Sequence, residues 1–237
     1  MPSARKPKAA QAFTRRVLAW FDRAGRDLPW RRTRDPYRVL VSEFMLQQTQ
    51  VSRVTEYYPR FLARFATLEQ LARARPKAVR EAWDGLGYYA RASNLHALAR
   101  VVSRDMGGTL PSQPDELVRL PGVGRYTAGA VASFAYEQPV AAVDTNVGRV
   151  LRRVFVAEHG ARSTEQRALW ALAQLLVPKT GKRAWKFNQA VMELGAVICV
   201  ARKPKCGVCP VRAVCKTGST EQMARSRKKE HGARSSS

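Results

Sequence analysis

LPGVGRYTAGAVASFAYEQPVAAVDTNVGRV, residues 120–150, is the stretch of sequence that decides the fold. The preceding PDELVRL (114–120) predicts a short helix, and Gly122 and Gly124 cannot sustain it further. RYTAGAVASFAYE (125–137) carries small and apolar residues at helical spacing, so a second helix is expected there. The PGVG segment is therefore predicted to form a tight hairpin between two helices.

This hairpin has the features of a phosphate-binding turn. Glycines let a phosphate come close to the backbone N–H groups, which we expect to point outward, and the following helix adds its positive dipole end. We expect Gly122, Val123, Gly124 and Arg125 to contact a nucleic-acid backbone. A turn of this kind is usually only a connector between helices, so the interpretation depends on the two flanking helices and on the basic chain.

Asp144 directly precedes TNVGRVLRRVF (145–155), which has an apolar stripe at helical spacing. It is therefore predicted to be the N-cap of a helix. Its carboxylate can serve only the helix amides, or it can also face a positive charge that develops in a cleft. The two roles are compatible, because capping holds the carboxylate rigidly.

The composition is strongly basic. The 237 residues are enough for one large or two small domains, and 42 lysines and arginines against 18 acidic residues give a formal charge of +24. Residues 1–10 contribute +3 and residues 216–237 contribute +4, which leaves +17 on the remainder. The basic character thus belongs to the folded part and indicates a polyanionic partner, for which nucleic acid is the natural candidate.

The chain shows no run of about 18 apolar residues and no apolar secretory signal at its N-terminus. We therefore expect a soluble intracellular protein without a membrane partner, located in the cytoplasm and associated with the nucleoid if the source is bacterial.

Helical spacing recurs along most of the remaining sequence, and no segment alternates like a strand. The expected fold class is all-α, with two helical lobes around a cleft. Residues 1–10 and 218–237 are predicted to be disordered basic tails around one folded unit, residues 11–217. The further predicted helices cover residues 12–24, 39–65, 68–74, 76–83, 91–106, 165–177 and 185–199. RDLPWRRTRDPYRVL (26–40) is expected to be a loop, either at a nucleic-acid surface or simply bounded by prolines.

SEFMLQQTQV (42–51) puts Glu43 on one helical strip with Gln47 and Gln50, at the start of an otherwise apolar helix. A carboxyl group that is buried there can hold a proton near neutral pH, as a general acid must. The alternative is a glutamate paired with one of the many arginines.

These motifs together resemble a known family. LPGVGRYTAGA followed by VDTNVGRV is similar to the helix–hairpin–helix and Gly/Pro–Asp core of the DNA glycosylase superfamily that includes endonuclease III. With SEFMLQQTQV, GLGYYARASNL (85–95) and four C-terminal cysteines, the chain resembles MutY-type adenine glycosylases over about residues 13–217. The resemblance implies one lobe of about residues 31–138, a second lobe that combines 11–30 with 139–217, and a DNA-binding cleft between them.

The resemblance also implies a reaction on double-stranded DNA with a mispaired or damaged base. The enzyme would extrude adenine opposite 8-oxoguanine or guanine and hydrolyse its N-glycosidic bond. Glu43 would protonate the leaving base, and Asp144 would stabilise the cationic sugar by charge or through a transient covalent bond. Tyr126 and Asn146 would support these two carboxyl groups.

Base and duplex contacts follow from the same resemblance. Leu28, Trp30 and Arg31 are expected near the extruded base, and Glu193 within reach of the adenine edge. Glu193 shares a helix face with Gln189, and its alternative role is solvated or capping.

Two short segments are expected to enter the duplex. Gln48 and Thr49 would lie where the base has left. Tyr88 would act as the wedge, with Leu86 beside it as a further DNA contact, although tyrosine pairs such as Tyr88–Tyr89 more often serve packing.

The four cysteines lie close together and have the spacing C-x6-C-x2-C-x5-C: Cys199, Cys206, Cys209 and Cys215. Structural zinc is the generic expectation for four clustered cysteines, but zinc sites usually have two close pairs and here there is one. The spacing also differs from that of ferredoxins. It is similar to the four-iron four-sulfur (4Fe-4S) loop of endonuclease III and MutY. Arg202, Lys203 and Lys205 inside the loop suggest a basic surface that contacts DNA.

Three departures from the family pattern qualify these expectations. Residues 144–146 read Asp-Thr-Asn where many MutY proteins have Asp-Gly-Asn. Tyr126 stands where endonuclease III relatives have the lysine that attacks the sugar, which implies a monofunctional hydrolase with little or no abasic-site lyase activity. Typical MutY proteins continue past the cysteines into a second domain that reads 8-oxoguanine, whereas the residues that follow them here are expected to be a polar tail.

The last departure leaves two rival functions open. The first is a thymine or uracil glycosylase acting opposite guanine, and the second is a non-catalytic DNA-binding iron–sulfur module. We expect a monomer whose abasic product passes to a downstream abasic-site endonuclease.

Overall fold

The computed structural model describes residues 7–156 and 162–218, and in these ranges all regular elements are helices, as predicted for the all-α class. The chain divides into two compact units. One is Asp27–Ala142, and the other combines Met1–Arg26 with Val143–Ser237. The divisions expected after residues 30 and 138 each lie four residues from these boundaries.

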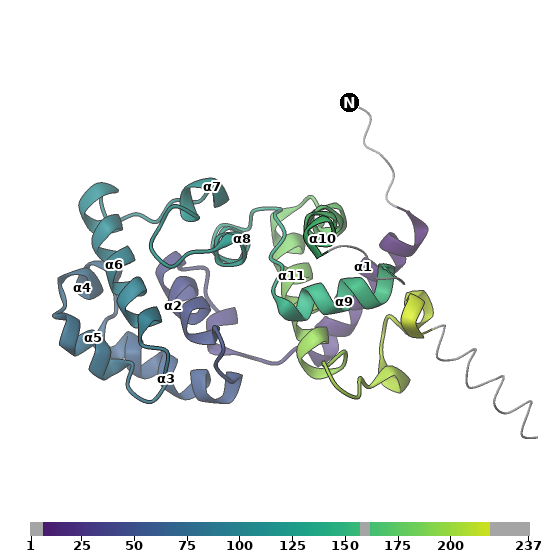
Figure 1. Cartoon of the computed structure of the whole chain (residues 1–237), viewed down its shortest axis with the longest axis horizontal. Coiled ribbons are helices and arrows are strands. Elements are labelled where there is room, and N and C mark those ends of the chain that lie inside the picture. Colours follow the sequence, from purple (N-terminus) through teal and green to yellow (C-terminus); the bar gives the residue numbers. More distant parts are fainter. Residues whose placement is uncertain (1–6, 157–161, 219–237) are drawn as a thin grey trace, which may run out of the picture. The chain divides into compact units, whose positions relative to one another are not determined.

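The unit Asp27–Ala142 is built around α2, which packs against α3, α6 and α8 (Figure 1). Large side chains that are fully buried here include Phe44 on α2, Phe61 on α3 and Trp83 after α5. The elements of this unit are the 3-10 helix η1 (Pro29–Arg31), α2 (Pro36–Leu46), α3 (Val51–Arg64), α4 (Leu68–Arg73), α5 (Pro76–Ala82), α6 (Ala90–Asp105), α7 (Pro114–Leu117) and α8 (Arg125–Phe134).

The start of α2 follows from its sequence. Asp35 caps the helix by accepting a hydrogen bond from the backbone N–H of Arg38, and Pro36 occupies the first helical position. The predicted loop 26–40 is therefore wrong in two places, because η1 and the first turns of α2 lie within it.

The end of α2 was not predicted. The single helix expected over residues 39–65 is wrong, since α2 ends at Leu46 and α3 begins at Val51. Gln48 has a φ of 55°, a left-handed conformation that interrupts a helix. The buried guanidinium of Arg91 donates to the carbonyl oxygens of Met45 and Gln47, so a tertiary contact satisfies acceptors that a continuing helix would have used.

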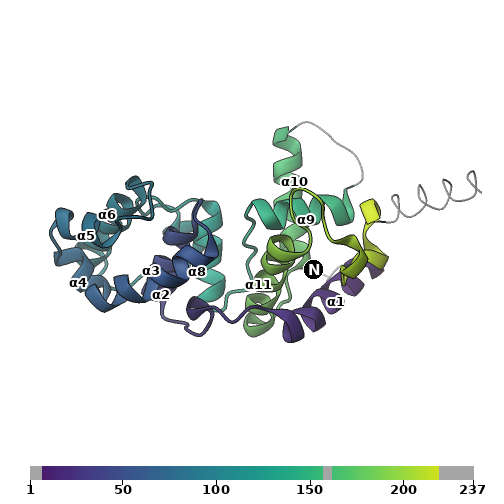
Figure 2. The ribbon, with the colours of Figure 1, turned by 90° about the horizontal axis from the view of Figure 1, so that it is seen from below.

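In the other unit, α11 packs against α1 and α9, and α10 also contacts both of these helices (Figure 2). Phe13 of α1 lies edge-on to Phe155 and Phe187, with ring centroids 5.2 and 6.2 Å apart. The elements of this unit are α1 (Lys8–Ala24), α9 (Thr145–Phe155), α10 (Arg162–Leu176), α11 (Gly181–Val197) and the 3-10 helices η2 (Cys206–Val208) and η3 (Arg212–Val214).

The tail predictions are partly corrected. Residues 8–10 belong to α1, whose Ala10 is buried, and Gly218 is buried beside the last cysteine. The remaining tail positions, residues 1–6 and 219–237, lie outside the described residues.

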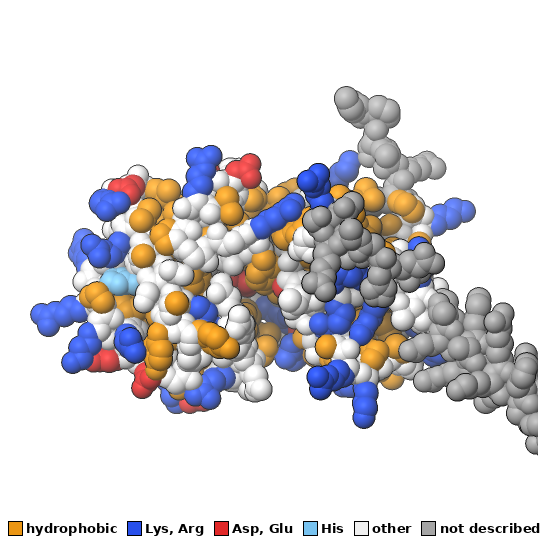
Figure 3. Space-filling view, in the orientation of Figure 1, with side chains coloured by type: hydrophobic (Ala, Val, Ile, Leu, Met, Phe, Trp, Pro, Cys, Tyr) orange, Lys and Arg blue, Asp and Glu red, His pale blue; other side chains and the backbone are white. Residues whose placement is uncertain are grey.

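Lysine and arginine side chains are spread over both units on the face drawn in Figure 3, where acidic side chains are few. This distribution agrees with a basic folded part. Among the described helices, none has the length and apolar content needed to cross a bilayer.

Candidate active site and cysteine cluster

Glu43 and Tyr126 form a buried hydrogen-bonded pair in the unit Asp27–Ala142. Glu43 lies in the buried middle of α2 and is 3% exposed. Tyr126 is the second residue of α8, which packs against α2, and its hydroxyl donates a hydrogen bond to Oε2 of Glu43 at 2.8 Å. The predicted strip shared with Gln47 and Gln50 is wrong, because α2 ends before either residue. The contact between α2 and α8 thus fixes Oε2 of Glu43.

The hairpin PGVG lies between α7 and α8, as predicted. Gly122 has a φ of 73°, and a Cβ there would meet the Cβ of Asn94 at 2.7 Å, so only glycine fits. Gly124 is exposed at the N-cap of α8, and a Cβ there would meet no atom within 4 Å. Arg125 is exposed at the start of α8.

Val123 departs from the expected hairpin geometry. Its side chain is buried, and its backbone N–H donates to the carbonyl of Leu120 at 3.1 Å. The expectation that the N–H groups of the turn point outward is therefore wrong for Val123. At Gly124 the residue is exposed and the space beside its Cα is open, so a phosphate could approach the backbone there.

The residues expected at the extruded base are largely buried. Leu28 and Trp30 are buried, and the Trp30 ring lies edge-on to Tyr58 with centroids 5.7 Å apart. Arg31 is half-buried at the end of η1. Only part of this segment is thus available to a ligand without movement.

The two segments expected to enter DNA carry unusual backbone conformations. Tyr88 is 62% exposed with a φ of 46°, and Gln48 is exposed with a φ of 55°. Thr49 is half-buried, and its hydroxyl donates to the carbonyl of Gln47 at 3.4 Å. Leu86 is buried, so its side chain does not present itself to DNA. Of these four side chains, those of Tyr88 and Gln48 are exposed.

Asp144 lies in the other unit, at the N-terminus of α9. The predicted N-cap is confirmed: Oδ1 accepts from the backbone N–H of Val147 at 2.7 Å. Nδ2 of Asn146 donates to Oδ2 at 2.8 Å, so both carboxylate oxygens are held. Burial raises the pKa of Asp144 above its ordinary value, although the hydrogen bonds from Val147 and Asn146 act in the opposite direction.

The support of Asp144 extends to the first cysteine. Nη2 of Arg149 donates to Oδ1 of Asn146 at 2.8 Å and to the carbonyl of Gly195 at 2.7 Å. Its Nε donates to the carbonyl of Cys199 at 2.8 Å. A Cβ on Gly195 would meet the Cβ of Asn146 at 2.7 Å, so α11 must carry glycine for this contact. Arg149 was not among the predicted site residues.

Glu193 is held by a bidentate ion pair that the sequence did not reveal. It lies on α11 and is 1% exposed. Arg26 donates from Nε to Oε1 at 2.5 Å and from Nη2 to Oε2 at 3.0 Å. Gln189 on the same helix is buried as well, so a solvated role for this face is wrong. The two partners are 167 residues apart, and no local pattern connects them.

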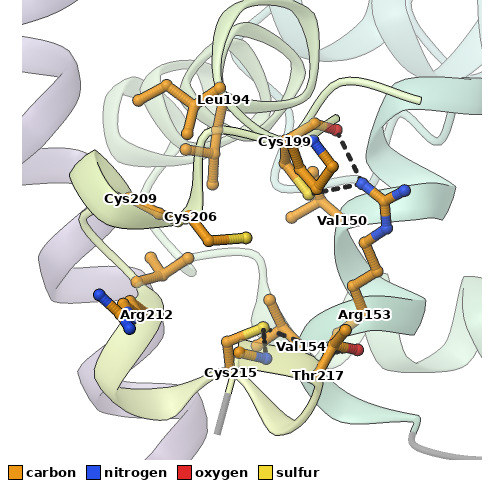
Figure 4. A pocket seen from close by; sticks show the side chains of 14 residues that line it. Val150, Arg153, Val154, Leu194, Cys199, Cys206, Cys209, Arg212, Cys215 and Thr217 are labelled. Carbon is orange, nitrogen blue, oxygen red and sulfur yellow. Dashed lines mark hydrogen bonds between the residues drawn. The ribbon is translucent and has the colours of Figure 1, made fainter. Parts of the chain in front are cut away.

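The four cysteines line a single cavity of about 190 Å³ that is bounded by α9, the end of α11 and the loop beyond it (Figure 4). A zinc ion would require four sulfurs about 2.3 Å from one point. Within the described part of the chain, no three cysteine, histidine or acidic side chains converge closely enough to hold one ion. Thiols that surround a cavity without meeting at a point fit a polynuclear cluster better than a single ion.

Arg153 of α9 connects the two ends of the cysteine loop. Its guanidinium donates to the carbonyl of Val200 at 2.8 Å and to Sγ of Cys199 at 3.4 Å, as Figure 4 shows for Cys199. Its backbone carbonyl accepts from Thr217 at 2.9 Å and from the thiol of Cys215 at 3.3 Å. One residue therefore holds the first and the last cysteine in place.

Burial raises the pKa of the Cys209 thiol to about 11. A cluster held by this thiol would therefore require its deprotonation, as metal-binding thiols do in general.

Comparisons with known proteins agree with this geometry. Residues 41–174 match the family model described as HhH-GPD superfamily base excision DNA repair protein, and residues 199–215 match the iron–sulfur binding domain of endonuclease III. An adenine DNA glycosylase of Rattus norvegicus is 46% identical over 86% of this chain and 41% of its own length. One of Mycolicibacterium smegmatis is 48% identical over 82% of this chain and 66% of its own. The chain thus spans about two fifths to two thirds of these relatives.

Solved structures show the same fold. A thermostable thymine-DNA glycosylase matches with a TM-score of 0.82 and 34% identity, covering 90% of this chain and 98% of that one. A non-covalent endonuclease III–DNA complex matches with a TM-score of 0.74 and 24% identity, covering 92% of this chain and all of that one. The chain therefore belongs to the HhH-GPD superfamily of base excision DNA repair proteins and carries the iron–sulfur binding domain of endonuclease III.

Proposed function

We propose that this protein is a monofunctional DNA glycosylase that removes adenine mispaired with 8-oxoguanine or guanine. The observation that carries the proposal is the buried contact between Glu43 and Tyr126, because a carboxyl group held in this way suits proton donation to a leaving base. The identity of 46–48% to adenine DNA glycosylases supports adenine as the base.

Glu43 is the proton donor in this proposal. The bond between the sugar and the base breaks with its electron pair going to the base, and the proton of Glu43 neutralises the departing adenine. Tyr126 orients the carboxyl group through its hydrogen bond to Oε2. Water then adds to the sugar, and its released proton restores Glu43, so the enzyme ends the cycle unchanged.

Asp144 stabilises the positive charge that develops on the sugar, either electrostatically or through a transient covalent bond. This role needs an ionised carboxylate in a fixed position. The hydrogen bonds from Val147 and Asn146 supply the position. Thr145, where relatives often have glycine, is the first residue of α9 and has ordinary helical geometry there, so it is compatible with this role.

Adenine recognition is assigned to the pair Arg26–Glu193, with Leu28, Trp30 and Arg31 near the base. Oε1 of Glu193 accepts from Nε and from the backbone N–H of Arg26, and Oε2 accepts from Nη2. A carboxylate group suits the amino group of adenine, because it accepts hydrogen bonds and donates none when ionised. A carboxylate that Arg26 holds in place can accept a hydrogen bond from an amino group, but it repels a carbonyl oxygen. It therefore distinguishes between the two groups.

The cysteine loop belongs to DNA binding and folding in this proposal, not to bond cleavage. The cluster, when bound, would be held by the four cysteine thiolates and would supply a rigid cross-link for the loop. Arg202, Lys203 and Lys205 are exposed on this loop and suit contacts to DNA phosphates.

The product is an intact abasic site in double-stranded DNA. A phenol at position 126 cannot form the Schiff base that an amine forms, so strand cleavage is left to a downstream abasic-site endonuclease. The protein would act as a monomer in the cytoplasm, on nucleoid DNA if bacterial. Borohydride trapping during turnover tests this part, and a covalent adduct formed as fast as base release would contradict it.

A second candidate is removal of thymine or uracil opposite guanine. The solved thymine-DNA glycosylase that matches this chain at 34% identity favours it. The test is alkali-induced strand scission on duplexes that contain A:8-oxoG, A:G, T:G or U:G. We expect scission at the adenine of the first two, whereas scission confined to T:G and U:G would favour the second candidate.

A further inference from the structure

Arg91 is a buried arginine on the first turn of α6, and it is 7% exposed. Its guanidinium donates to carbonyl oxygens on two separate segments of the chain. The acceptors are Phe44 at 3.1 Å, Met45 at 2.8 Å and Gln47 on one segment, and Leu86 and Gly87 at 3.1 Å each on the other.

The first segment is the end of α2, whose last carbonyl groups would otherwise have no hydrogen-bond donors within the helix. The second is the glycine-bounded turn before α6. A guanidinium is a rigid planar fork, so acceptors bound to both of its Nη atoms are held at a fixed separation. Arg91 therefore sets the distance between these two segments.

The charge of Arg91 has no carboxylate partner among the residues that the structure describes, and Nε has no hydrogen-bond partner. Only carbonyl dipoles and the faces of Trp83 and Tyr88, each 5.5 Å from the guanidinium, compensate it. A buried cation without a counter-charge is costly, and an apolar side chain would fill the same space without that penalty. The burial of this charge is explained if the carbonyl groups that Arg91 binds must keep fixed positions.

The residues that follow these carbonyls have strained backbones. Gln48 follows Gln47, and Tyr88 follows Gly87; both have left-handed φ values, 55° and 46°. The described part of the chain has only two other non-glycine residues with positive φ, Glu137 and Lys203. Such conformations persist where the surroundings enforce them, and they are frequent at functional sites. Both strained residues have exposed side chains.

We propose that Arg91 is a positioning residue that locks the Gln48 segment and the Tyr88 turn into one rigid unit, so that both side chains enter the duplex at the same extruded nucleotide. The proposal rests on the proposed glycosylase function. It assigns Arg91 to base extrusion and not to bond cleavage, because within the described residues its guanidinium binds these two segments and faces the rings of Trp83 and Tyr88.

The test compares Arg91→Lys with Arg100→Lys, a charge-conserving control at an exposed position of the same helix. An ammonium has three donors on one atom and cannot bridge both segments. Single-turnover adenine release is measured with adenine paired to 8-oxoguanine and with adenine in a single-base bulge, where less pairing must be broken. We expect Arg91→Lys to lose about tenfold or more on the paired substrate and much less on the bulge.

A loss of the same size on both substrates would overturn the proposal, since it would indicate general damage or a role in cleavage. Glu43→Gln supplies that pattern as a reference, because a proton donor is needed on either substrate. Arg100→Lys should behave like the unaltered protein on both.

Hydrogen exchange without DNA separates this proposal from the function it rests on. Arg91→Lys should increase amide exchange in residues 47–50 and 86–88 together, and Arg100→Lys in neither. An increase in one segment alone, or in none, overturns the positioning role whatever the substrate.

If Arg91→Lys fails to fold, hydrogen exchange of the unaltered protein still tests the proposal. Its two segments should open with one common free energy, and separate openings would contradict the proposal. Joint opening in a protein that releases no adenine would leave the positioning role standing and reject the glycosylase assignment.

Discussion

The hydroxyl of Tyr126 donates a hydrogen bond to Oε2 of Glu43 at 2.8 Å, and this contact joins two helices whose residues lie 83 positions apart. Tyr126→Phe removes the donor and keeps the ring. We expect the single-turnover rate of adenine release to fall about tenfold, the value of one hydrogen bond to a charged or polarised group. Tyr136→Phe is the matched control, because its hydroxyl donates only to the carbonyl of Leu110. The control should lower the unfolding temperature and leave the rate unchanged; equal rates for both variants would contradict the role of Tyr126.

Asp144→Asn should lower the rate of base release without unfolding α9. Asparagine caps a helix as well as aspartate does, so α9 keeps its N-cap. Without a negative charge beside the sugar, we expect base release to fall by at least about 100-fold. Circular dichroism and a single-turnover assay on the same preparation check both halves.

The pH dependence of the stability of Asp144→Asn follows from the direction in which the pKa of Asp144 is shifted. Burial raises the pKa of Asp144 in the folded state above its ordinary value of 3.8. The stability that its protonated form contributes is present below that ordinary value and is lost as the pH rises through the folded-state pKa. Asp144→Asn should therefore be at least as stable as the unaltered protein at neutral pH. Any gain in stability of the variant over the unaltered protein should vanish below about pH 3.8. A variant that is less stable than the unaltered protein at neutral pH, but equally stable at low pH, would contradict this expectation.

The two hairpin glycines should respond differently to substitution. Gly124→Ala adds a methyl group where no protein atom lies within 4 Å, so folding should be unaffected. If a DNA phosphate approaches this backbone, binding should weaken several-fold. Gly122→Ala places a Cβ 2.7 Å from the Cβ of Asn94 at a φ of 73°, so it should lower the unfolding temperature. DNA titration and thermal unfolding of both variants measure this; unchanged affinity in Gly124→Ala would exclude phosphate contact there.

Arg153 should determine how well the cysteine loop retains its cluster. Arg153→Ala removes the bonds from the guanidinium to Cys199 and Val200, whereas Arg152→Ala removes an exposed guanidinium from the same helix. We expect a chelator to bleach the absorbance of the cluster at about 400 nm faster in Arg153→Ala, by roughly tenfold, because hydrogen bonds to charged groups are strong. Equal bleaching rates in the two variants would exclude this role.

The sequence predicted what depends on local pattern. Asp144 was predicted as an N-cap because an apolar helical stripe begins immediately after it, and the structure has that cap. The break after Leu46 was not predicted, because it depends on a guanidinium 45 positions further along the chain. A signal was present, however: Arg91 shares the buried face of α6 with Leu95, Leu98 and Val102, where a charged residue is unexpected.

The pairings within the site lie beyond local pattern. Glu193 was expected at the base on resemblance, and its bond to Arg26 spans 167 residues. Arg149 and Arg153 were not predicted as site residues, yet both donate to carbonyl groups at Cys199 and Val200. In a chain with 42 lysines and arginines, sequence alone does not distinguish the arginines that hold the structure from those that face DNA.

The central claim is that this chain releases adenine by protonation from Glu43. The most direct measurement is mass-spectrometric identification of the free base released in a single turnover from an A:8-oxoG duplex, with Glu43→Gln in parallel. We predict free adenine and an intact abasic strand with the unaltered protein, and a rate at least about 100-fold lower with the variant. No adenine from the unaltered protein, or adenine released at an equal rate by Glu43→Gln, would contradict the account.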